Sequence, residues 1–359
     1  MSLDYLAVHQ FRNLLQLEIE PDAELNIITG HNAAGKTSLL ESIFYLSFGR
    51  SFRQGQYRDL IMHNQDHFRL FSRLHHSLQA YTVGIQRSTR DQLIRINQQT
   101  VSRLSDLSAL LPVIAIHPDS HQLISSGPEN RRHFMDWGVF HVEHCFLQVW
   151  KDYKTALSQR NAALRSRQDD RMCNLWNIAL VENAEQIDKY RTAYLDQLNK
   201  KISKITQLIF PDSQIQLEYK KGWSGEVGYA DALELNLSKD RDKGYTQSGP
   251  HRSDIKIKLD NQSAQTSISR GQQKKLVTLL RLAQLDLYVE HAKRPCILLF
   301  DDLPAELDVN SQHALMNILA SMKVQLFVTA IDAEQLDYSA FTSAKLFHVE
   351  HGVISTVNN

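Results

Sequence analysis

The sequence predicts an α/β fold that is interrupted by a mainly helical segment. Two observations support this prediction. Apolar runs of strand length alternate with helical patterns at both ends of the chain, whereas helical periodicity prevails from Asn130 to Phe210, with almost no Gly or Pro. The chain has 359 residues, which is enough for one large domain or two ordinary ones.

The first third of the chain is predicted to be rich in strands. A Gly-containing loop, Gly30–Lys36, follows the third strand, and a helix with an apolar face is expected at Thr37–Phe48. The expected strands are Leu3–Phe11, Leu14–Ile19, Glu24–Thr29, Arg69–Leu74, Ala80–Gln86, Leu93–Asn97 and Val113–Ile116.

One long helix is predicted in the middle of the chain, ending at Pro211. Its apolar residues recur at steps of three and four, which is typical of a face that packs against a neighbouring helix. Those residues are Ile187, Tyr190, Tyr194, Leu198, Ile202, Ile205 and Ile209. With Phe134–Leu164 as its partner, the segment is expected to form a helical arm.

Strands and helices alternate again toward the C-terminus. A polar linker is expected at Ser238–Gln247 and helices at Gln272–Val289 and Asn310–Met322. Strands are expected at Ile215–Glu218, Cys296–Phe300, Gln325–Thr329 and Ala344–Glu350. The predicted division is therefore 1–125, the arm at 126–235, and 236–359.

The composition is that of a globular protein, with 42% hydrophobic and 22% charged residues, which argues against global disorder. Lys plus Arg and Asp plus Glu each number 40, so binding to nucleic acid would depend on local patches. Cys145, Cys173 and Cys296 form no CxxC pair, so no zinc site or disulfide framework is indicated. No signal peptide or bilayer-length apolar run is evident, so we expect a cytoplasmic protein without a membrane partner.

The loop after the third strand fits the pattern G-x-x-x-x-G-K-[ST]. Its residues are Gly30, His31, Asn32, Ala33, Ala34, Gly35, Lys36 and Thr37. Backbone N–H groups of such a loop, together with the N-terminus of the following helix, bind phosphates. Lys36 would reach the β- and γ-phosphates, and the Thr37 hydroxyl would be a magnesium ligand. A chance match is the alternative, but the preceding apolar strand and the following helix favour a nucleotide site.

A pair of carboxylates follows the apolar run Ile297–Phe300. Asp301 is the candidate for holding magnesium, and Asp302 is the candidate general base that orients the attacking water. An acidic cap after an ordinary strand is the alternative. The phosphate-binding loop makes the nucleotide interpretation stronger.

A third motif, Ser269-Arg270-Gly271-Gln272-Gln273, precedes the helix predicted near Gln272. It is similar to the signature of ABC-type ATPases, in which Ser269, Gly271 and Gln272 would form a second anion site at a helix N-terminus. A simple N-cap serine is the alternative. The position of the motif about thirty residues before Asp301 favours the signature.

Taken together, these motifs resemble the RecF family of SMC-like ABC-type ATPases over essentially the whole chain. Pro304–Asp308 resembles the D-loop of that fold, and Thr329 stands where transporter ATPases have a switch histidine. The residues that carry the resemblance are Phe11-Arg12-Asn13, Gly30–Thr37, Ser51-Phe52-Arg53, Gly127-Pro128, Arg131-Arg132, Asp136-Trp137, Gln159-Arg160-Asn161, Ala163-Leu164, Gly249-Pro250-His251-Arg252, Asp254, Ser269–Lys275 and Asp301–Asp308.

The resemblance implies a P-loop ATPase head of ABC/SMC type with a helical arm subdomain inserted. It implies ATP and Mg²⁺ as cofactors, Arg12 as a further nucleotide contact, and an ATP-dependent homodimer in which Lys36 and Ser269 serve one ATP from different subunits. It also implies a weak DNA-stimulated ATPase that binds duplex DNA and single-strand/duplex junctions. Such a protein would act near the nucleoid with RecR and RecO to load RecA at gaps, and would be linked to replication and the SOS response.

Two other functions stay open at this stage. One is the ATPase subunit of a transporter, which the missing switch histidine disfavours, and the other is an SMC-type chromosome ATPase, which would need a far longer coiled coil. Basic residues of the arm are candidates for DNA phosphate contacts, with a solvated helix surface as the alternative. They are Arg131, Arg132, Lys151, Lys154, Arg160, Arg165, Arg167 and Arg171.

Overall fold

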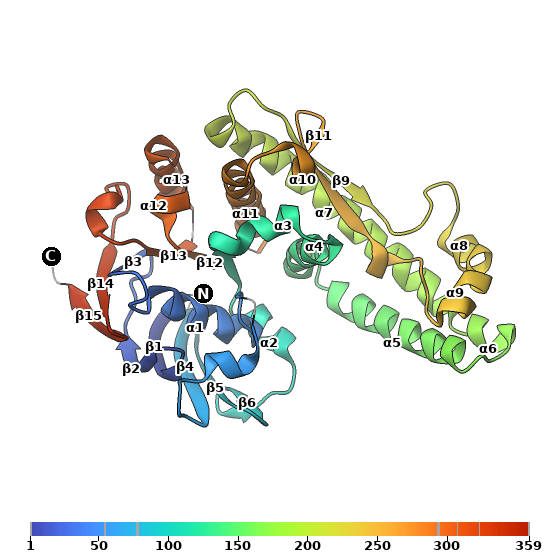
Figure 1. Cartoon of the computed structure of the whole chain (residues 1–359), viewed down its shortest axis with the longest axis horizontal. Helices are drawn as coiled ribbons and strands as arrows, with labels where there is room; N and C mark the ends of the chain where they lie inside the picture. Colours follow the sequence, from blue (N-terminus) through green and yellow to red (C-terminus); the bar gives the residue numbers. More distant parts are fainter. Residues whose placement is uncertain are drawn as a thin grey trace. The chain divides into compact units, whose positions relative to one another are not determined.

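The structure is a computed structural model that describes residues 2–53, 55–76, 79–292, 295–306, 308–322 and 324–357. Contacts divide the chain into two compact units (Figure 1). Unit 1 comprises Met1–Ser120 and Lys293–Asn359, and unit 2 comprises His121–Ala292. Each unit is described by itself below.

A six-stranded sheet that is mostly parallel forms the centre of unit 1. Its strands, in spatial order, are β15 (Val353–Val357), β14 (Ala344–Glu350), β3 (Leu25–Thr29), β13 (Val324–Thr329), β12 (Cys296–Phe300) and β8 (Val113–Ile116). All neighbours pair in parallel except β15, which is antiparallel to β14. Every residue of β3, β12 and β13 is buried, which explains why these strands are mostly apolar and lack a regular polar alternation. The parallel arrangement places the carboxyl ends of these strands at one edge of the sheet.

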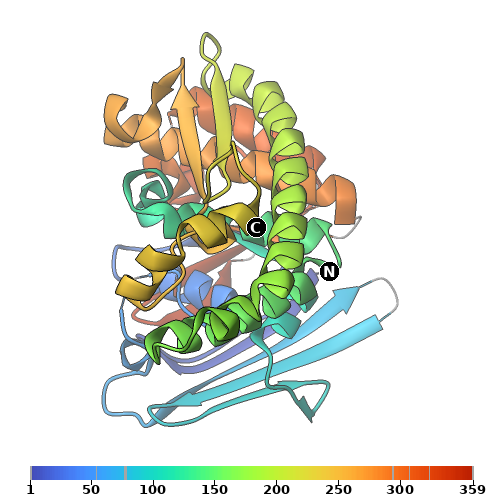
Figure 2. The ribbon, with the colours of Figure 1, turned by 90° about the vertical axis from the view of Figure 1, so that its right-hand side faces the viewer.

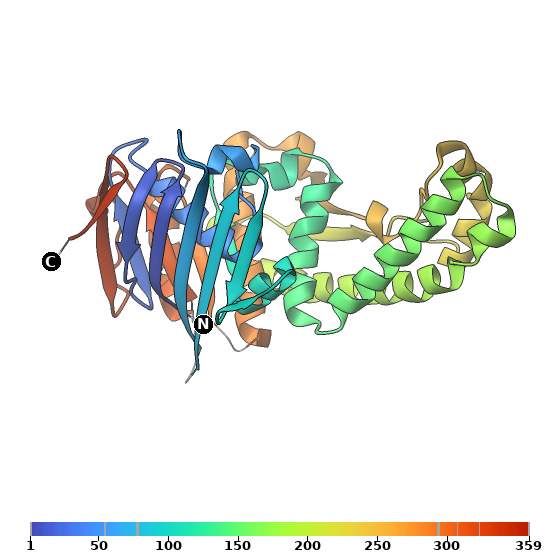
Figure 3. The same ribbon diagram turned by 90° about the horizontal axis from the view of Figure 1, so that it is seen from below.

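A second, antiparallel sheet of six strands belongs to the same unit (Figure 3). Its order is β2 (Leu14–Ile19), β1 (Ser2–Phe11), β4 (His67–His76), β5 (Gln79–Ser88), β6 (Gln92–Ile96) and β7 (Gln99–Thr100). Helix α1 (Lys36–Phe48) shares one apolar core with both sheets through Leu39, Leu40 and Ile43, none of which is exposed. The helix was expected to have one apolar face, but Glu41, Ser42 and Ser47 are buried as well, because α1 is covered on all sides.

Shorter helices complete unit 1. They are η1 (Tyr57–Leu60), α2 (Leu104–Leu110), η2 (Pro118–His121, which crosses into unit 2), α12 (Leu303–Glu306), α13 (Val309–Ser321) and η4 (Ala333–Gln335). Asp308 caps α13 by accepting a hydrogen bond from the Ser311 N–H at 3.0 Å. Leu307, a residue of the expected D-loop, lies outside the described residues.

Unit 2 is mainly helical, and the long helix α7 (Asn177–Ile209) runs along it (Figure 2). The predicted stripe is buried at Ile187, Tyr194, Leu198, Ile202 and Ile205, where α7 packs against α5, α11 and β9. The other helices are α3 (Gln122–Ser125), α4 (Pro128–Val142), α5 (Phe146–Arg165), α6 (Asp170–Asn174), α8 (Tyr229–Leu235), α9 (Leu237–Lys243), η3 (Pro250–Arg252), α10 (Ala264–Ser267) and α11 (Arg270–Ala292). A small antiparallel sheet has the order β11 (Gln262–Ser263), β10 (Asp254–Leu259) and β9 (Ile215–Lys220).

The partner segment expected at Phe134–Leu164 consists of two helices, since α4 ends at Val142 and α5 begins at Phe146. One sequence expectation for the arm needs correction. The polar linker expected at Ser238–Gln247 is wrong, because most of it forms α9. Leu237 packs against a small buried cluster, and Asp240 is fully buried, so tertiary contacts hold this polar sequence in a helix.

The compact units also differ from the predicted division. Helix α11 packs against α4 and α7, so residues 236–292 belong to unit 2 by contact instead of joining the C-terminal segment. Within the described ranges, none of the helices combines the length and apolarity that a bilayer span requires.

Candidate nucleotide site

The loop between β3 and α1 needs a glycine at both ends. Gly30 has φ 143°, and a Cβ there would lie 2.2 Å from the carbonyl oxygen of Val349. Gly35 has φ 122°, and a Cβ there would lie 2.9 Å from a methyl carbon of Leu14. Both positions therefore exclude other residues for reasons of backbone conformation and of space. The loop lies at the carboxyl end of β3 and leads directly into α1, as the motif predicts.

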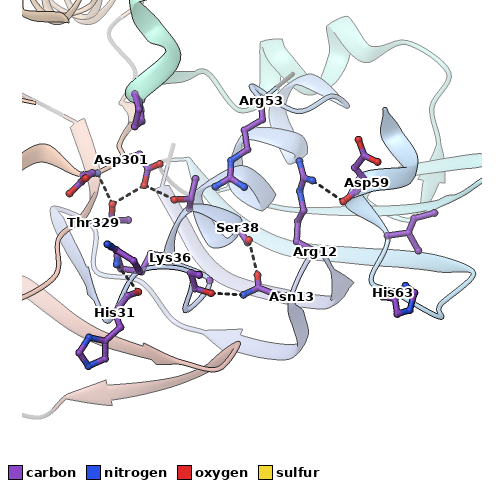
Figure 4. A pocket seen from close by; sticks show the side chains of 17 residues that line it. Arg12, Asn13, His31, Lys36, Ser38, Arg53, Asp59, His63, Asp301 and Thr329 are labelled. Carbon is purple, nitrogen blue, oxygen red and sulfur yellow. Dashed lines mark hydrogen bonds between the residues drawn. The ribbon is translucent and has the colours of Figure 1, made fainter. Parts of the chain in front are cut away.

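The Lys36 ammonium group folds back over this loop (Figure 4). Its Nζ donates to the carbonyl oxygens of Gly30 at 2.6 Å and His31 at 3.0 Å. Burial lowers the pKa of Lys36, although the nearby carboxylates of Asp302 and Asp301 act in the opposite direction. A partly desolvated cation above a curled loop suits an anionic ligand, because a phosphate would offset the cost of desolvation.

Asp301 follows β12 and joins the two halves of the expected site. Thr37 Oγ1 and Thr329 Oγ1 donate to the same carboxylate oxygen, Oδ1, at 3.0 Å and 2.9 Å (Figure 4). Asp301 is 5% exposed, and burial raises its pKa, while these two hydroxyl groups lower it in part. The motif residues Thr37 and Asp301, 264 positions apart in sequence, are thus within hydrogen-bond distance.

Thr329 is a site residue that sequence reasoning treated only as a missing histidine. Its hydroxyl oxygen accepts a hydrogen bond from the Asp302 N–H at 2.7 Å while donating to Asp301. Asp302 has φ 58°, a left-handed conformation that is uncommon outside glycine. Thr329 therefore positions the carboxylate of Asp301 and the backbone of Asp302. The sequence did contain a signal for Thr329, because it is a polar residue at the end of the apolar run that forms β13, the strand next to β12.

A second wall of the site carries arginines. Arg12, in the turn between β1 and β2, donates through Nε and a terminal nitrogen to the two oxygens of Glu41 at 2.9 Å and 2.7 Å. Arg53 lies 3.9 Å from the same carboxylate. Asn13 accepts from Ser38 at 2.8 Å beside the loop. Glu41 was missed from the sequence because an acidic residue on a predicted helix is ordinarily solvated.

These side chains surround a pocket of about 680 Å³, a size typical of small-molecule sites. Gly30 and Ala34 belong to the loop but are not among the lining residues. Of the residues singled out from the sequence as nucleotide, magnesium or catalytic residues, those that line it are Arg12, His31, Asn32, Ala33, Gly35, Lys36, Thr37, Asp301 and Asp302. Lining residues that were not singled out are Asn13, Ser38, Arg53, Asp59, Ile61, His63, Pro118 and Thr329.

The signature residues lie in unit 2, at the beginning of α11, and are not among the lining residues of this pocket. Ser269 and Gln272 form a reciprocal cap, in which the Gln272 N–H donates to Ser269 Oγ at 3.3 Å and the Ser269 N–H donates to Gln272 Oε1 at 3.0 Å. Ser269, Gly271 and Gln272 are all exposed. A Cβ built on Gly271 would meet no atom within 4 Å. The fold of this chain therefore does not itself require glycine at position 271.

Two of the candidate DNA contacts are structural. Arg160 is fully buried and pairs with buried Asp240 at 2.7 Å, and Arg131 is 7% exposed and pairs with Asp254 at 2.7 Å. The suggestion that these two arginines contact DNA phosphates is wrong for this structure, because their guanidinium groups hold unit 2 together. Arg132 is partly buried and donates to the carbonyl oxygen of Ser253. Of the other candidates, Lys151 is partly exposed, and Lys154, Arg165, Arg167 and Arg171 are exposed.

Comparison with known proteins identifies the family. The sequence model described as "RecF/RecN/SMC N terminal domain" matches residues 2–355. The chain belongs to this family. A relative from Thioalkalivibrio sulfidiphilus, named DNA replication and repair protein RecF, is 39% identical over 356 residues and covers 99% of both chains. A Haemophilus ducreyi protein of the same name is 38% identical and covers 99% of this chain and 100% of its own.

Similarity to solved structures shows that this RecF/RecN/SMC family member has the expected ABC/SMC-type fold. A structure described as "the recombination mediator protein RecF-ATP in RecFOR pathway" has a TM-score of 0.88 at 24% identity, covering 99% of this chain and 98% of that chain. The Smc head domain from Pyrococcus furiosus has a TM-score of 0.62 at 14% identity, covering 99% and 96%. The expected ABC/SMC-type fold and the expected resemblance to RecF are both confirmed.

Proposed function

We propose that this chain is a RecF-like ATPase of DNA replication and recombinational repair, which binds DNA in an ATP-dependent way. The observation that carries the proposal is the 3.0 Å hydrogen bond from Thr37 to Asp301, since it joins the phosphate-binding loop to the acidic strand end in one pocket. The names of the relatives, which are about two-fifths identical over the full chain, supply the DNA context.

The residues of the pocket account for hydrolysis of ATP. The loop N–H groups and Lys36 bind the phosphates, for which Lys36 turns from the loop carbonyls to the β- and γ-phosphates. Thr37 and Asp301 supply the oxygen ligands that suit Mg²⁺, which when bound would neutralise charge between the β- and γ-phosphates. Asp302 accepts a proton from the attacking water while the oxygen of that water forms a bond to the γ-phosphorus. The bond between the γ-phosphorus and the bridging oxygen breaks, and that oxygen leaves with ADP.

A second subunit would complete the site. Gly271 is exposed in the first turn of α11. Because a Cβ there would meet nothing in this chain, the free space suits the close approach of a ligand held by another molecule. We assign that ligand as the γ-phosphate of an ATP bound at Lys36 of a second copy, contacted by Ser269, Gly271 and Gln272. ATP would then hold a homodimer together, and DNA affinity would follow the nucleotide state by linkage.

DNA would bind across this dimer in the cytoplasm, at duplex regions and single-strand/duplex junctions of the nucleoid. Among the arm candidates, Lys154, Arg165, Arg167 and Arg171 are exposed, so they can contact phosphates without breaking a buried ion pair. By resemblance, RecR and RecO would be partners in loading RecA, and hydrolysis would reset the complex. We further propose that turnover is weak without DNA.

ATP turnover measured with and without duplex DNA tests this function. We expect slow Mg²⁺-dependent phosphate release that rises when duplex DNA is added, and a monomer-to-dimer shift with ATP by size-exclusion chromatography with light scattering. Lys36→Ala is the matched control and should show neither effect. A transporter ATPase subunit would hydrolyse ATP at a rate indifferent to DNA, and that result would count against the proposal.

A further inference from the structure

A carboxylate with no solvent exposure lies behind the pocket wall. Glu41 is on α1, whose neighbouring residues Leu40 and Ile43 belong to the apolar core shared by the two sheets of unit 1. A buried ion pair is weak evidence for stability, because apolar residues of similar volume often serve as well or better. The position of Glu41 therefore calls for a reason other than packing.

Glu41 is bonded to both arginine-bearing segments of the pocket wall. Its two oxygens accept from Arg12 in the β1–β2 turn, and Oε1 also accepts from the Ser51 hydroxyl. Ser51 Oγ in turn accepts from the backbone N–H of Arg53 at 2.8 Å. The Arg53 guanidinium is 3.9 Å from Glu41 and reaches the same pocket as Arg12 (Figure 4).

The geometry of Arg12 is fixed around all three of its nitrogen atoms. Nε and one terminal nitrogen bond to Glu41, and the other terminal nitrogen donates to the carbonyl oxygen of Asp59 at 2.9 Å. Each terminal nitrogen keeps one further N–H, because a guanidinium is a planar fork with more donors than these bonds use. Arg12 is 20% exposed at the side chain and lines the pocket, so these remaining donors are available to an anion.

One buried carboxylate, that of Glu41, thus faces two arginines, and the carboxylate of Asp59 also lines the pocket. Lys36 lies near the carboxylates of Asp301 and Asp302. The Arg12 wall is distinguished by a guanidinium that is held in place and keeps two unused N–H donors. A nucleotide phosphate is the ligand that such a fixed, two-donor cation suits.

We propose that Glu41 is a positioning residue for the ATPase reaction, which acts by holding Arg12 and Arg53 in register with the phosphates of the bound nucleotide. The inference rests on the proposed function, since it concerns the same pocket. Glu41 would not touch the nucleotide and would act through Arg12 in particular, because it bonds to Nε and one terminal nitrogen of that guanidinium.

A double-mutant cycle between Glu41 and Arg12 tests this inference. The Kd for a fluorescent ATP analogue and the kcat and KM for ATP are measured for the parent, Glu41→Gln, Arg12→Gln and the double variant. We expect Glu41→Gln to weaken nucleotide binding about tenfold, the scale of a lost charge-assisted hydrogen bond. In the Arg12→Gln background, Glu41→Gln should raise the Kd for the analogue by less than about twofold, because the two residues act as one unit. Equal losses in both backgrounds would overturn the inference and leave Glu41 a packing residue.

Three controls separate this result from simpler ones. Glu18→Gln, at an exposed position of β2 outside the pocket, removes a carboxylate without touching either arginine and should leave Kd unchanged. Glu41→Asp keeps the buried charge and should lie between the parent and Glu41→Gln, and it takes over the cycle if Glu41→Gln does not fold. If the parent itself fails to bind the analogue, the proposed function is refuted. If the parent binds and Glu41→Gln and Glu41→Asp bind equally well, only the role of Glu41 is refuted.

Discussion

Asp301→Asn should make the nucleotide-free protein more stable and the nucleotide-bound protein less stable than the parent. Both hydroxyl groups that bond to Asp301, those of Thr37 and Thr329, donate to Oδ1. An asparagine can place its carbonyl oxygen at that position and keep both hydrogen bonds. The change therefore removes a negative charge that burial disfavours and keeps both hydrogen bonds. It also removes a candidate magnesium ligand.

The expected change in the free energy of unfolding can be set from general magnitudes for substitutions and ligand binding. A single stabilising substitution commonly adds about 0.5–2 kcal/mol. For a unit of about 150–250 residues, each kcal/mol of added stability raises the thermal unfolding midpoint by about 2–4 °C. Saturation of the parent with ATP at about 100 times Kd adds about 2.7 kcal/mol, which exceeds the gain of the variant. Asp301→Asn should gain much less from ATP and Mg²⁺, so the order of the two midpoints should reverse.

The difference in stability between Asp301→Asn and the parent, measured without nucleotide, should depend on pH. Burial raises the pKa of Asp301 above its ordinary value of 3.8, so the folded state holds a proton that the unfolded state has lost. The stability that this proton provides is full below pH 3.8 and falls as pH rises through the raised pKa. The advantage of Asp301→Asn should therefore vanish at low pH and be largest at pH 7–8, where thermal unfolding by circular dichroism would reveal it. A variant less stable than the parent at pH 7.5 without nucleotide, or an order that does not reverse with ATP and Mg²⁺, would refute this reasoning.

Three further substitutions have defined outcomes. Lys36→Ala should abolish ATP binding by calorimetry, whereas Lys36→Arg should bind without turnover because a planar guanidinium cannot take the position of the ammonium group; parental turnover by Lys36→Arg would contradict the site assignment. Asp302→Asn should bind ATP and accumulate a long-lived dimer, visible by light scattering, because the amide cannot accept the proton of water; hydrolysis at the parental rate would place the base elsewhere. Thr329→Val should lower kcat about tenfold or more, because an unpaired Asp302 N–H costs about 1–3 kcal/mol, and Thr329→Ser should restore it; unchanged phosphate release by the valine variant would remove Thr329 from the site.

The sequence was informative where backbone geometry alone determines the residue. Gly30 and Gly35 are required by their positive φ angles and close neighbours, and the apolar strand before Asp301 is required by burial on both sides. Local patterns of this kind correctly placed the loop, the acidic pair and the long helix α7.

Residues fixed by distant partners were harder to predict. Arg160 and Asp240 are 80 positions apart, and their mutual burial turned an expected DNA contact and an expected linker into a structural pair. Glu41 looks like an exposed helix residue until the second sheet covers α1. Periodicity describes one element at a time, so it cannot show which polar residue another element will bury.

The central claim, that two chains share each ATP, is tested most directly by mixing two inactive variants. Lys36→Ala lacks the phosphate-binding cation, and Ser269→Arg blocks the exposed signature site in unit 2. Each variant alone should be inactive, and Ser269→Arg should still bind ATP as a monomer. An equal mixture should regain part of the parental turnover, because each mixed dimer would carry one intact site of two. A mixture as inactive as its components, or a parent that hydrolyses ATP at full rate while light scattering shows only monomer, would contradict the account.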